Sequence, residues 1–111
     1  MKPFSFCLSG TEIEKRIPVL DCSNSNKMKS GIVILKPGED VGCHNTNNRE
    51  ELIIVLEGRA KVEIESKPFE QVESDSAVYI PPNTEHNIIN NSDKTLRYIY
   101  VVSPVEWKRK N

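Results

Sequence analysis

The sequence is poor in residue types on which several classes of protein depend. Its three cysteines, Cys7, Cys22 and Cys43, are odd in number, widely spaced and free of any CxxC pattern. A disulfide framework is therefore not expected, and a reducing, cytoplasmic setting is predicted. The longest aliphatic run, residues 52–56, is far shorter than the roughly 20 residues that a membrane helix needs. The apolar stretch at the N-terminus is also too short for a signal peptide, so no membrane partner is expected.

An excess of charge of either sign is also lacking. Fifteen basic residues stand against sixteen acidic ones. Binding to phosphate backbones requires a basic excess on one face, so nucleic acid is not expected as the main partner. A chain of 111 residues is expected to form one domain, which hides roughly two-thirds of its unfolded surface on folding.

Short strand patterns, separated by Gly, Pro and Asn turns, run through the chain. Within one of them Ala60, Val62 and Ile64 alternate with charged residues, as in a half-buried strand. No segment keeps a helical period over more than two turns. About eight strands of this kind predict a β-sandwich or β-barrel. The expected strands cover residues 14–20, 32–35, 52–57, 59–65, 77–82, 86–90 and 95–104.

The two histidines of the chain flank its most apolar strands. His44 precedes the 52–57 strand, and His86 follows the Pro81–Pro82 pair. Alternate residues of a strand share a face, so His44 and Thr46 are expected on one side, while Glu51 belongs to the next strand. If these strands line a barrel, His44, Glu51 and His86 converge, and two imidazoles with one carboxylate suit a divalent first-row metal. The alternative is two surface histidines and an exposed acid.

A spaced motif runs through the first histidine. Gly38 is followed after five residues by His44, then by Thr46, after four more by Glu51, and after six more by Gly58. This spacing resembles the first motif of the cupin family, in which a second histidine stands where this chain has Thr46.

A second motif surrounds the other histidine, sixteen residues after the first motif ends. Asp75, Pro81, Asn83, His86 and Asn90 follow the spacing of the second cupin motif, with Asp75 and Asn83 in place of its two glycines. Asn and Asp tolerate left-handed backbone conformations, so both turns are expected to keep their shape.

The resemblance implies an all-β fold, a double-stranded β-helix or jelly-roll barrel. Residues 1–111 are then a single cupin domain, with its motifs at 38–58 and 75–90. In the family, the matching residues usually bind iron, manganese, nickel, copper or zinc. Carried over by position, His44, Glu51 and His86 match three of the four metal ligands.

Thr46 leaves three interpretations open. A three-ligand site holds the metal, with water in the vacated position. Alternatively, the metal is lost and the barrel is a polar pocket. In the third, Asn45, Asn47 or Cys43 replaces the missing ligand, which needs a local bulge; otherwise Cys43 is expected to pack as a small residue. A threonine hydroxyl is a poor donor to a transition metal and at best hydrogen-bonds a bound water or substrate.

The family spans enzymes and binding modules, so the fold does not decide the function. One hypothesis is a metal-dependent enzyme, oxygenase-like or isomerase-like, acting on a small polar molecule. Another is a metal-free module that binds a sugar or small acid through Thr46, Asn45 and His86. The candidate ligand-binding residues are Thr46, Asn45, Asn47 and Tyr79. A third is a structural or regulatory protein whose dimer surface is the functional part.

Tyr79 and Tyr100 are expected in the core or the pocket, and Arg49 at the barrel mouth or in solvent. Small cupins often pair, so a homodimer is also expected.

Overall fold

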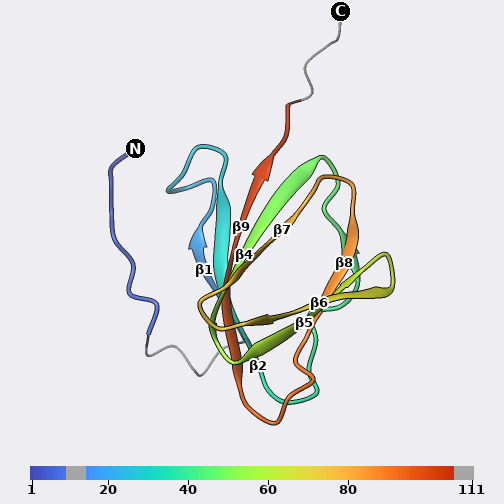
Figure 1. Cartoon of the computed structure of the whole chain (residues 1–111). Helices are drawn as coiled ribbons and strands as arrows, with labels where there is room; N and C mark the ends of the chain where they lie inside the picture. Colours follow the sequence, from blue (N-terminus) through green and yellow to red (C-terminus); the bar gives the residue numbers. More distant parts are fainter. Residues whose placement is uncertain (10–14, 107–111) are drawn as a thin grey trace, which may run out of the picture.

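The computed structural model describes residues 1–9 and 15–106, and these contain strands and no helix (Figure 1). No helix in these ranges is long and apolar enough to cross a membrane. The strands are β1 (Arg16–Leu20), β2 (Lys29–Leu35), β3 (His44–Asn45), β4 (Arg49–Glu57), β5 (Arg59–Ile64), β6 (Lys67–Glu73), β7 (Ala77–Ile80), β8 (Glu85–Ile89) and β9 (Leu96–Pro104).

The strands form two antiparallel sheets. A five-stranded sheet has the order β1-β2-β9-β4-β7, and a four-stranded sheet has the order β3-β8-β5-β6. From β6 onward the chain changes sheet at every step, and β4 and β5 lie in different sheets although only Gly58 separates them (Figure 1). This alternation is the winding of a double-stranded β-helix, so the all-β jelly-roll prediction is confirmed.

The core lies between the sheets and follows the alternation of the strands. Ile53 and Val55 on β4 face Ala60 and Val62 on β5, and all four are fully buried. Each fully buried valine or isoleucine side chain contributes about 1.5–3 kcal/mol. The core therefore holds the two sheets together and fixes where their inward-facing polar residues meet.

Several predicted strands are confirmed, with shifts at their ends. The first predicted strand appears as β1 at the edge of its sheet, and Glu14 lies outside the described residues. β2 begins earlier than predicted, at Lys29, because Lys29 and Ser30 pair with β9. β6 was missed because only Val72 of its seven residues is buried, which leaves no apolar alternation in the sequence.

The two turns that lack the family's glycines keep a left-handed backbone. Asn83 has φ 54° and Asp75 has φ 65°, so the expectation that these residues preserve the turns is confirmed. Asn90, the last residue of the second motif, is fully buried. Its amide donates hydrogen bonds to the carbonyls of Leu35 and Lys94, at 2.9 and 2.7 Å. Asn90 therefore ties two chain segments together at the closed end of the barrel.

The three cysteines are free and exposed. The expectation that no disulfide framework exists is confirmed for Cys7, Cys22 and Cys43. The expectation that Cys43 packs as a small apolar residue is wrong, because its side chain lies at the surface, where a hydrogen bond from its thiol to Glu85 raises the pKa of the thiol.

Candidate metal centre

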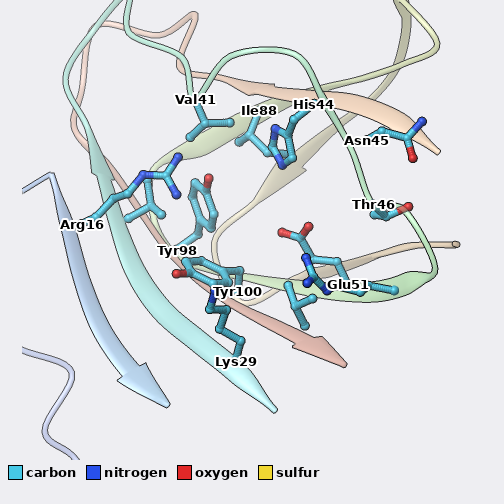
Figure 2. A pocket seen from close by; sticks show the side chains of 13 residues that line it. Arg16, Lys29, Val41, His44, Asn45, Thr46, Glu51, Ile88, Tyr98 and Tyr100 are labelled. Atoms are coloured by element: carbon cyan, nitrogen blue, oxygen red, sulfur yellow. The ribbon is translucent and has the colours of Figure 1, made fainter. Parts of the chain in front are cut away.

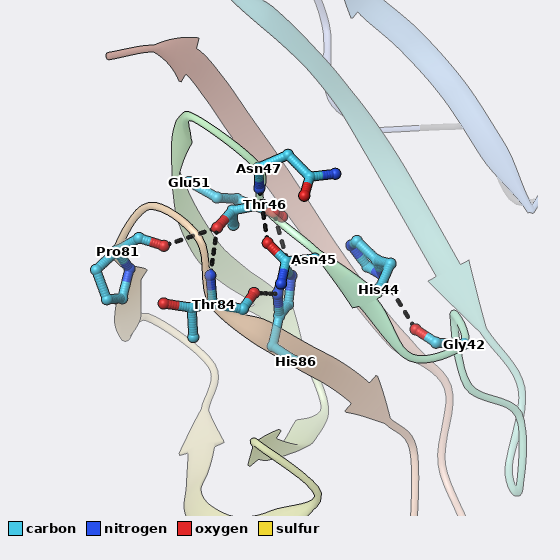
Figure 3. A network of polar contacts seen from close by, with 9 residues as sticks. All are labelled: Gly42, His44, Asn45, Thr46, Asn47, Glu51, Pro81, Thr84 and His86. Atoms are coloured by element: carbon cyan, nitrogen blue, oxygen red, sulfur yellow. Dashed lines mark hydrogen bonds and ion pairs between the residues drawn. The ribbon is translucent and has the colours of Figure 1, made fainter. Parts of the chain in front are cut away.

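Three strands bring His44, Glu51 and His86 together between the two sheets. His44 on β3 and His86 on β8 are directly opposite one another in the four-stranded sheet, with ring centroids 4.2 Å apart. Glu51 projects from β4 of the facing sheet (Figure 3). One ligand atom from each residue lies within 4.8 Å of those of the other two. The cluster is compatible with metal binding, since the donor atoms surround one point.

Backbone carbonyls orient both imidazole rings. Nδ1 of His44 lies 3.0 Å from the carbonyl oxygen of Gly42, and Nδ1 of His86 lies 3.2 Å from that of Thr84 (Figure 3). A carbonyl oxygen only accepts hydrogen bonds, so Nδ1 donates in both rings. In a neutral ring the lone pair is then on Nε2, which is the arrangement usual for histidines that bind a metal.

The Nε2 atom of His86 is buried without a hydrogen-bond partner among the described residues. Oε1 of Glu51 lies 3.3 Å from it, but the two atoms do not meet the geometry of a hydrogen bond. Burial lowers the pKa of His86, whereas Glu51 and the Thr84 carbonyl raise it, and the net effect raises the pKa above its usual value. A buried nitrogen that faces a carboxylate in this way favours a cation beside it.

Thr46 is buried beside this cluster, but its hydroxyl is engaged with the backbone. Oγ1 donates to the carbonyl oxygen of Pro81 at 2.8 Å and accepts from the backbone N–H of Thr84 at 2.9 Å (Figure 3). Thr46 therefore ties the end of β3 to the turn before β8. At the position of the family's second histidine, this chain therefore has a side chain that holds two backbone segments of the site together.

The remaining predicted ligand-binding residues are divided between the pocket and the surface. Asn45 lines the pocket, and its Oδ1 accepts a 2.8 Å hydrogen bond from the N–H of Asn47. Asn47 has φ 45° and is not in the lining. Tyr79 is 53% exposed on the outer face of β7, where its hydroxyl donates to Glu50. The structure therefore places Asn45 near the cluster and does not bring Asn47 or Tyr79 to it.

Two residues of the cluster, His44 and Glu51, line a pocket of about 290 Å³, whereas His86 is not part of its lining (Figure 2). Arg49 and Tyr100 line this pocket, whereas sequence reasoning missed Arg16, Lys29 and Tyr98. The alternation of β9 contained a signal for Tyr98, since it shares a face with Tyr100. Arg16 and Lys29 left no such signal, because their positions depend on how β1 and β2 pair with the rest of the sheet. The complete lining is Arg16, Lys29, Val33, Val41, His44, Asn45, Thr46, Arg49, Glu51, Ile88, Tyr98, Tyr100 and Val102.

Comparison with known families agrees with this geometry. A family model described as a cupin domain matches residues 31–102, most of the chain, including both motifs. The chain belongs to the cupin family. This cupin has His44, Glu51 and His86 clustered together, and His44 and Glu51 also line the pocket described above.

Solved structures share the fold at low sequence identity. A protein from Bacillus halodurans is 20% identical, with 99% of this chain and 87% of that chain covered and a TM-score of 0.79. An RmlC-like cupin family protein with a double-stranded β-helix fold, from Methanocaldococcus jannaschii, is 21% identical, with 94% and 91% covered and a TM-score of 0.74. These likenesses establish the fold.

Two curated relatives have a higher sequence identity to this chain than these solved structures do. The polyketide synthase CurC of Streptomyces cyaneus is 31% identical over 78 residues, which are 70% of this chain and 50% of that protein. An uncharacterised protein of Methanocaldococcus jannaschii is 32% identical over 66 residues, 60% of this chain and 52% of that protein. The matched region spans about half the length of these curated relatives.

Proposed function

We propose that this cupin binds a divalent transition metal through His44, Glu51 and His86, and binds or acts on a small polar molecule beside it. The observation that carries the proposal is the unpartnered Nε2 of buried His86, which lies 3.3 Å from a Glu51 oxygen. Two imidazoles and a carboxylate are donors that iron, manganese, nickel, copper and zinc all accept. A bound cation would give that nitrogen the partner it lacks.

The residues around the cluster prepare it for this role. The carbonyls of Gly42 and Thr84 hold the two rings with Nε2 free. Thr46 keeps the end of β3 against the turn before β8, so that His44 stays opposite His86. A bound metal would act as a Lewis acid on an oxygen of the small molecule.

Three protein ligands leave open positions for water and for the small molecule. Since the Thr46 hydroxyl is hydrogen-bonded to the backbone, this chain does not supply a fourth protein donor at that position. The pocket in front of the cluster has a volume of about 290 Å³, at the lower end of the range for small-molecule sites. The partner is therefore a small molecule rather than a polymer.

Elemental analysis of untagged protein, loaded with each metal in turn and then dialysed, tests the proposal. Wild type is expected to retain close to one metal ion per chain. Glu51→Gln and His86→Ala are expected to bind it at least about tenfold more weakly, because each removes one donor. Glu50→Gln is the matched control, since Glu50 is next to Glu51 but faces the outer side of β4, where Tyr79 contacts it.

Thermal unfolding gives a second readout. A metal that binds only the native state stabilises it by about 2.7 kcal/mol at one hundred times its Kd. This increase should occur in wild type and Glu50→Gln and disappear in Glu51→Gln. Equal metal content and equal stabilisation in the Glu50 and Glu51 variants would refute the metal site.

A further inference from the structure

The pocket has a charge balance unlike that of the whole chain. The whole chain has fifteen basic and sixteen acidic residues. The pocket lining instead contains three permanent cations, Arg16, Lys29 and Arg49, and a single carboxylate, that of Glu51. None of the three cations forms an ion pair with another residue in the described ranges 1–9 and 15–106. Within these described ranges, the pocket lining therefore carries three cations that no carboxylate pairs with, even before a metal binds.

The carboxylate of Asp21 lies near Lys29 but does not form an ion pair with it. Asp21 follows β1, and its pKa is lowered mainly by hydrogen bonds from Ser23 and only slightly by the charge of Lys29. The carboxylate of Asp21 is thus held by its own turn. Lys29 keeps its capacity to meet an anion in the pocket.

A buried hydroxyl reaches into the same pocket. Tyr98 is only 3% exposed, and its hydroxyl has no hydrogen-bond partner among the described residues. Burial and the charge of Glu51 raise the pKa of Tyr98, while the charge of Arg16 partly opposes them. The hydroxyl therefore stays protonated and can donate. Because Tyr98 lines the pocket, its hydroxyl can donate to an acceptor on a bound molecule.

The donors line the same pocket as His44 and Glu51. In Figure 2 the guanidinium of Arg16 and the hydroxyl of Tyr98 lie at one end, near Val41, and Lys29 lies beside Tyr100 below them. Tyr100 can lie flat over β2 because its neighbour there is Gly31, where even a Cβ atom would come within 2.8 Å of the tyrosine hydroxyl. The three cations and Tyr98 thus reach the pocket from the five-stranded sheet, as Glu51 does, and His44 reaches it from β3 of the other sheet.

We infer that the ligand of this pocket is a small organic carboxylate whose carboxylate group is bound by Arg16 and Tyr98, with Lys29 and Arg49 supplying further positive charge. The inference rests on the proposed function in one respect: the rest of the ligand is taken to face a metal held by His44, Glu51 and His86. An arginine matches the two oxygens of a carboxylate with two parallel N–H donors, and the Tyr98 hydroxyl adds a third donor.

The same donors are a poorer match for a phosphate group. Phosphate sites usually use several backbone N–H groups at a helix N-terminus or in a nest. Residues 1–9 and 15–106 contain no helix, and the polar groups of the pocket are side chains. A carboxylate needs no such backbone site and is therefore the better match.

Titration of ¹⁵N-labelled protein, metal-free and zinc-loaded, with malonate tests this inference. Malonamide, the neutral analogue of the same size, and inorganic phosphate are the comparison probes. We expect malonate to bind wild type at least about tenfold more tightly than either. Arg16→Gln is expected to weaken malonate binding about tenfold or more, and Tyr98→Phe severalfold. Lys67→Gln removes one positive charge from exposed β6 and should change the affinity less than about twofold.

The outcomes separate this inference from the proposed function. Metal bound at one per chain, with equal affinity for malonate and malonamide, overturns the carboxylate site and leaves the metal site standing. If malonate binding depends on Arg16 but the protein retains no metal after loading, the metal site alone is overturned. Tighter binding of phosphate than of malonate, or no loss of affinity in folded Arg16→Gln and Tyr98→Phe, overturns the assignment of these residues. The amide spectrum of each variant verifies that it is folded.

Discussion

Two buried polar side chains of the site show how this chain departs from its family's pattern. Thr46 has two hydrogen bonds to the backbone, whereas Nε2 of His86 has none with the described residues. A buried polar group without a partner destabilises the fold unless a ligand or an ion supplies one. Thr46 therefore stabilises the local backbone, and the buried atom without a hydrogen bond, Nε2 of His86, lies at the proposed metal site.

The role of Thr46 leads to a prediction about stability. Thr46→Val keeps the shape of the side chain but leaves the buried N–H of Thr84 and the carbonyl of Pro81 without their partner. The free energy of unfolding is expected to fall by about 1–3 kcal/mol, measured by urea denaturation of the metal-free protein.

Thr46→Ser is the control for this change. It retains both hydrogen bonds and loses one methyl group, worth about 0.8 kcal/mol at most. Metal content should be the same in the valine and serine variants, because the hydroxyl is not among the proposed ligands. A valine variant as stable as wild type would show that the two hydrogen bonds do not hold this turn.

At the scale of elements, the site depends on strands whose ends are held by unusual turns. β4 passes directly into β5 in the other sheet through Gly58, which has φ 84°. A Cβ atom there would lie 2.4 Å from the carbonyl oxygen of Thr95. Gly38, at the start of the first motif, has nearly the same φ of 85° but nothing within 4 Å of its Cβ position. The two glycines share a backbone conformation and differ in the space around them.

Alanine substitution at both positions separates the two effects. Gly38→Ala is expected to cost about 1–2 kcal/mol, the penalty for a left-handed backbone alone. Gly58→Ala should cost about 1–3 kcal/mol more, because Cβ also collides with the Thr95 carbonyl. Chemical denaturation of the two variants side by side gives the difference. Equal losses would mean that the chain near Thr95 moves aside without cost.

At the scale of the whole molecule, the outer face of the five-stranded sheet exposes apolar side chains on β4 and β7. Leu52 on β4 and Tyr79 on β7 are directly paired and are 39% and 53% exposed. The edge strand β1 belongs to the same sheet. Exposed apolar side chains that adjoin one another on a sheet face are typical of an association surface, and a pair of identical chains is the commonest assembly.

We therefore expect a homodimer formed through this face. Light scattering of wild type should give twice the mass of the chain, and Leu52→Lys should shift the population to the monomer, because the contact would bury an unpaired charge. Phe69→Lys is the control, since Phe69 is also exposed, at 55%, but lies on β6 of the other sheet. A wild-type monomer, or dissociation only in the Phe69 variant, would contradict this interface.

The sequence by itself determined the features that depend on spacing along the chain. Strand alternation predicted the inward side of β4, and the two motifs predicted that His44, Glu51 and His86 belong to one site. The left-handed turns at Asp75 and Asn83 followed from the residue types alone. These features are local, because each depends on the backbone preferences and alternation of a few neighbouring residues.

Only the tertiary structure decided which distant residues share the pocket and where each polar group points. Pairing of β1 with β2 and of β2 with β9 brings Arg16 into register with Tyr98 and Lys29 opposite Val102, and all three line one pocket. The fold of the turn before β8 directs the Thr46 hydroxyl to the backbone, and the register of β7 turns Tyr79 outward. Register between strands far apart in the chain results from packing of the whole core, so no short stretch of sequence contains it.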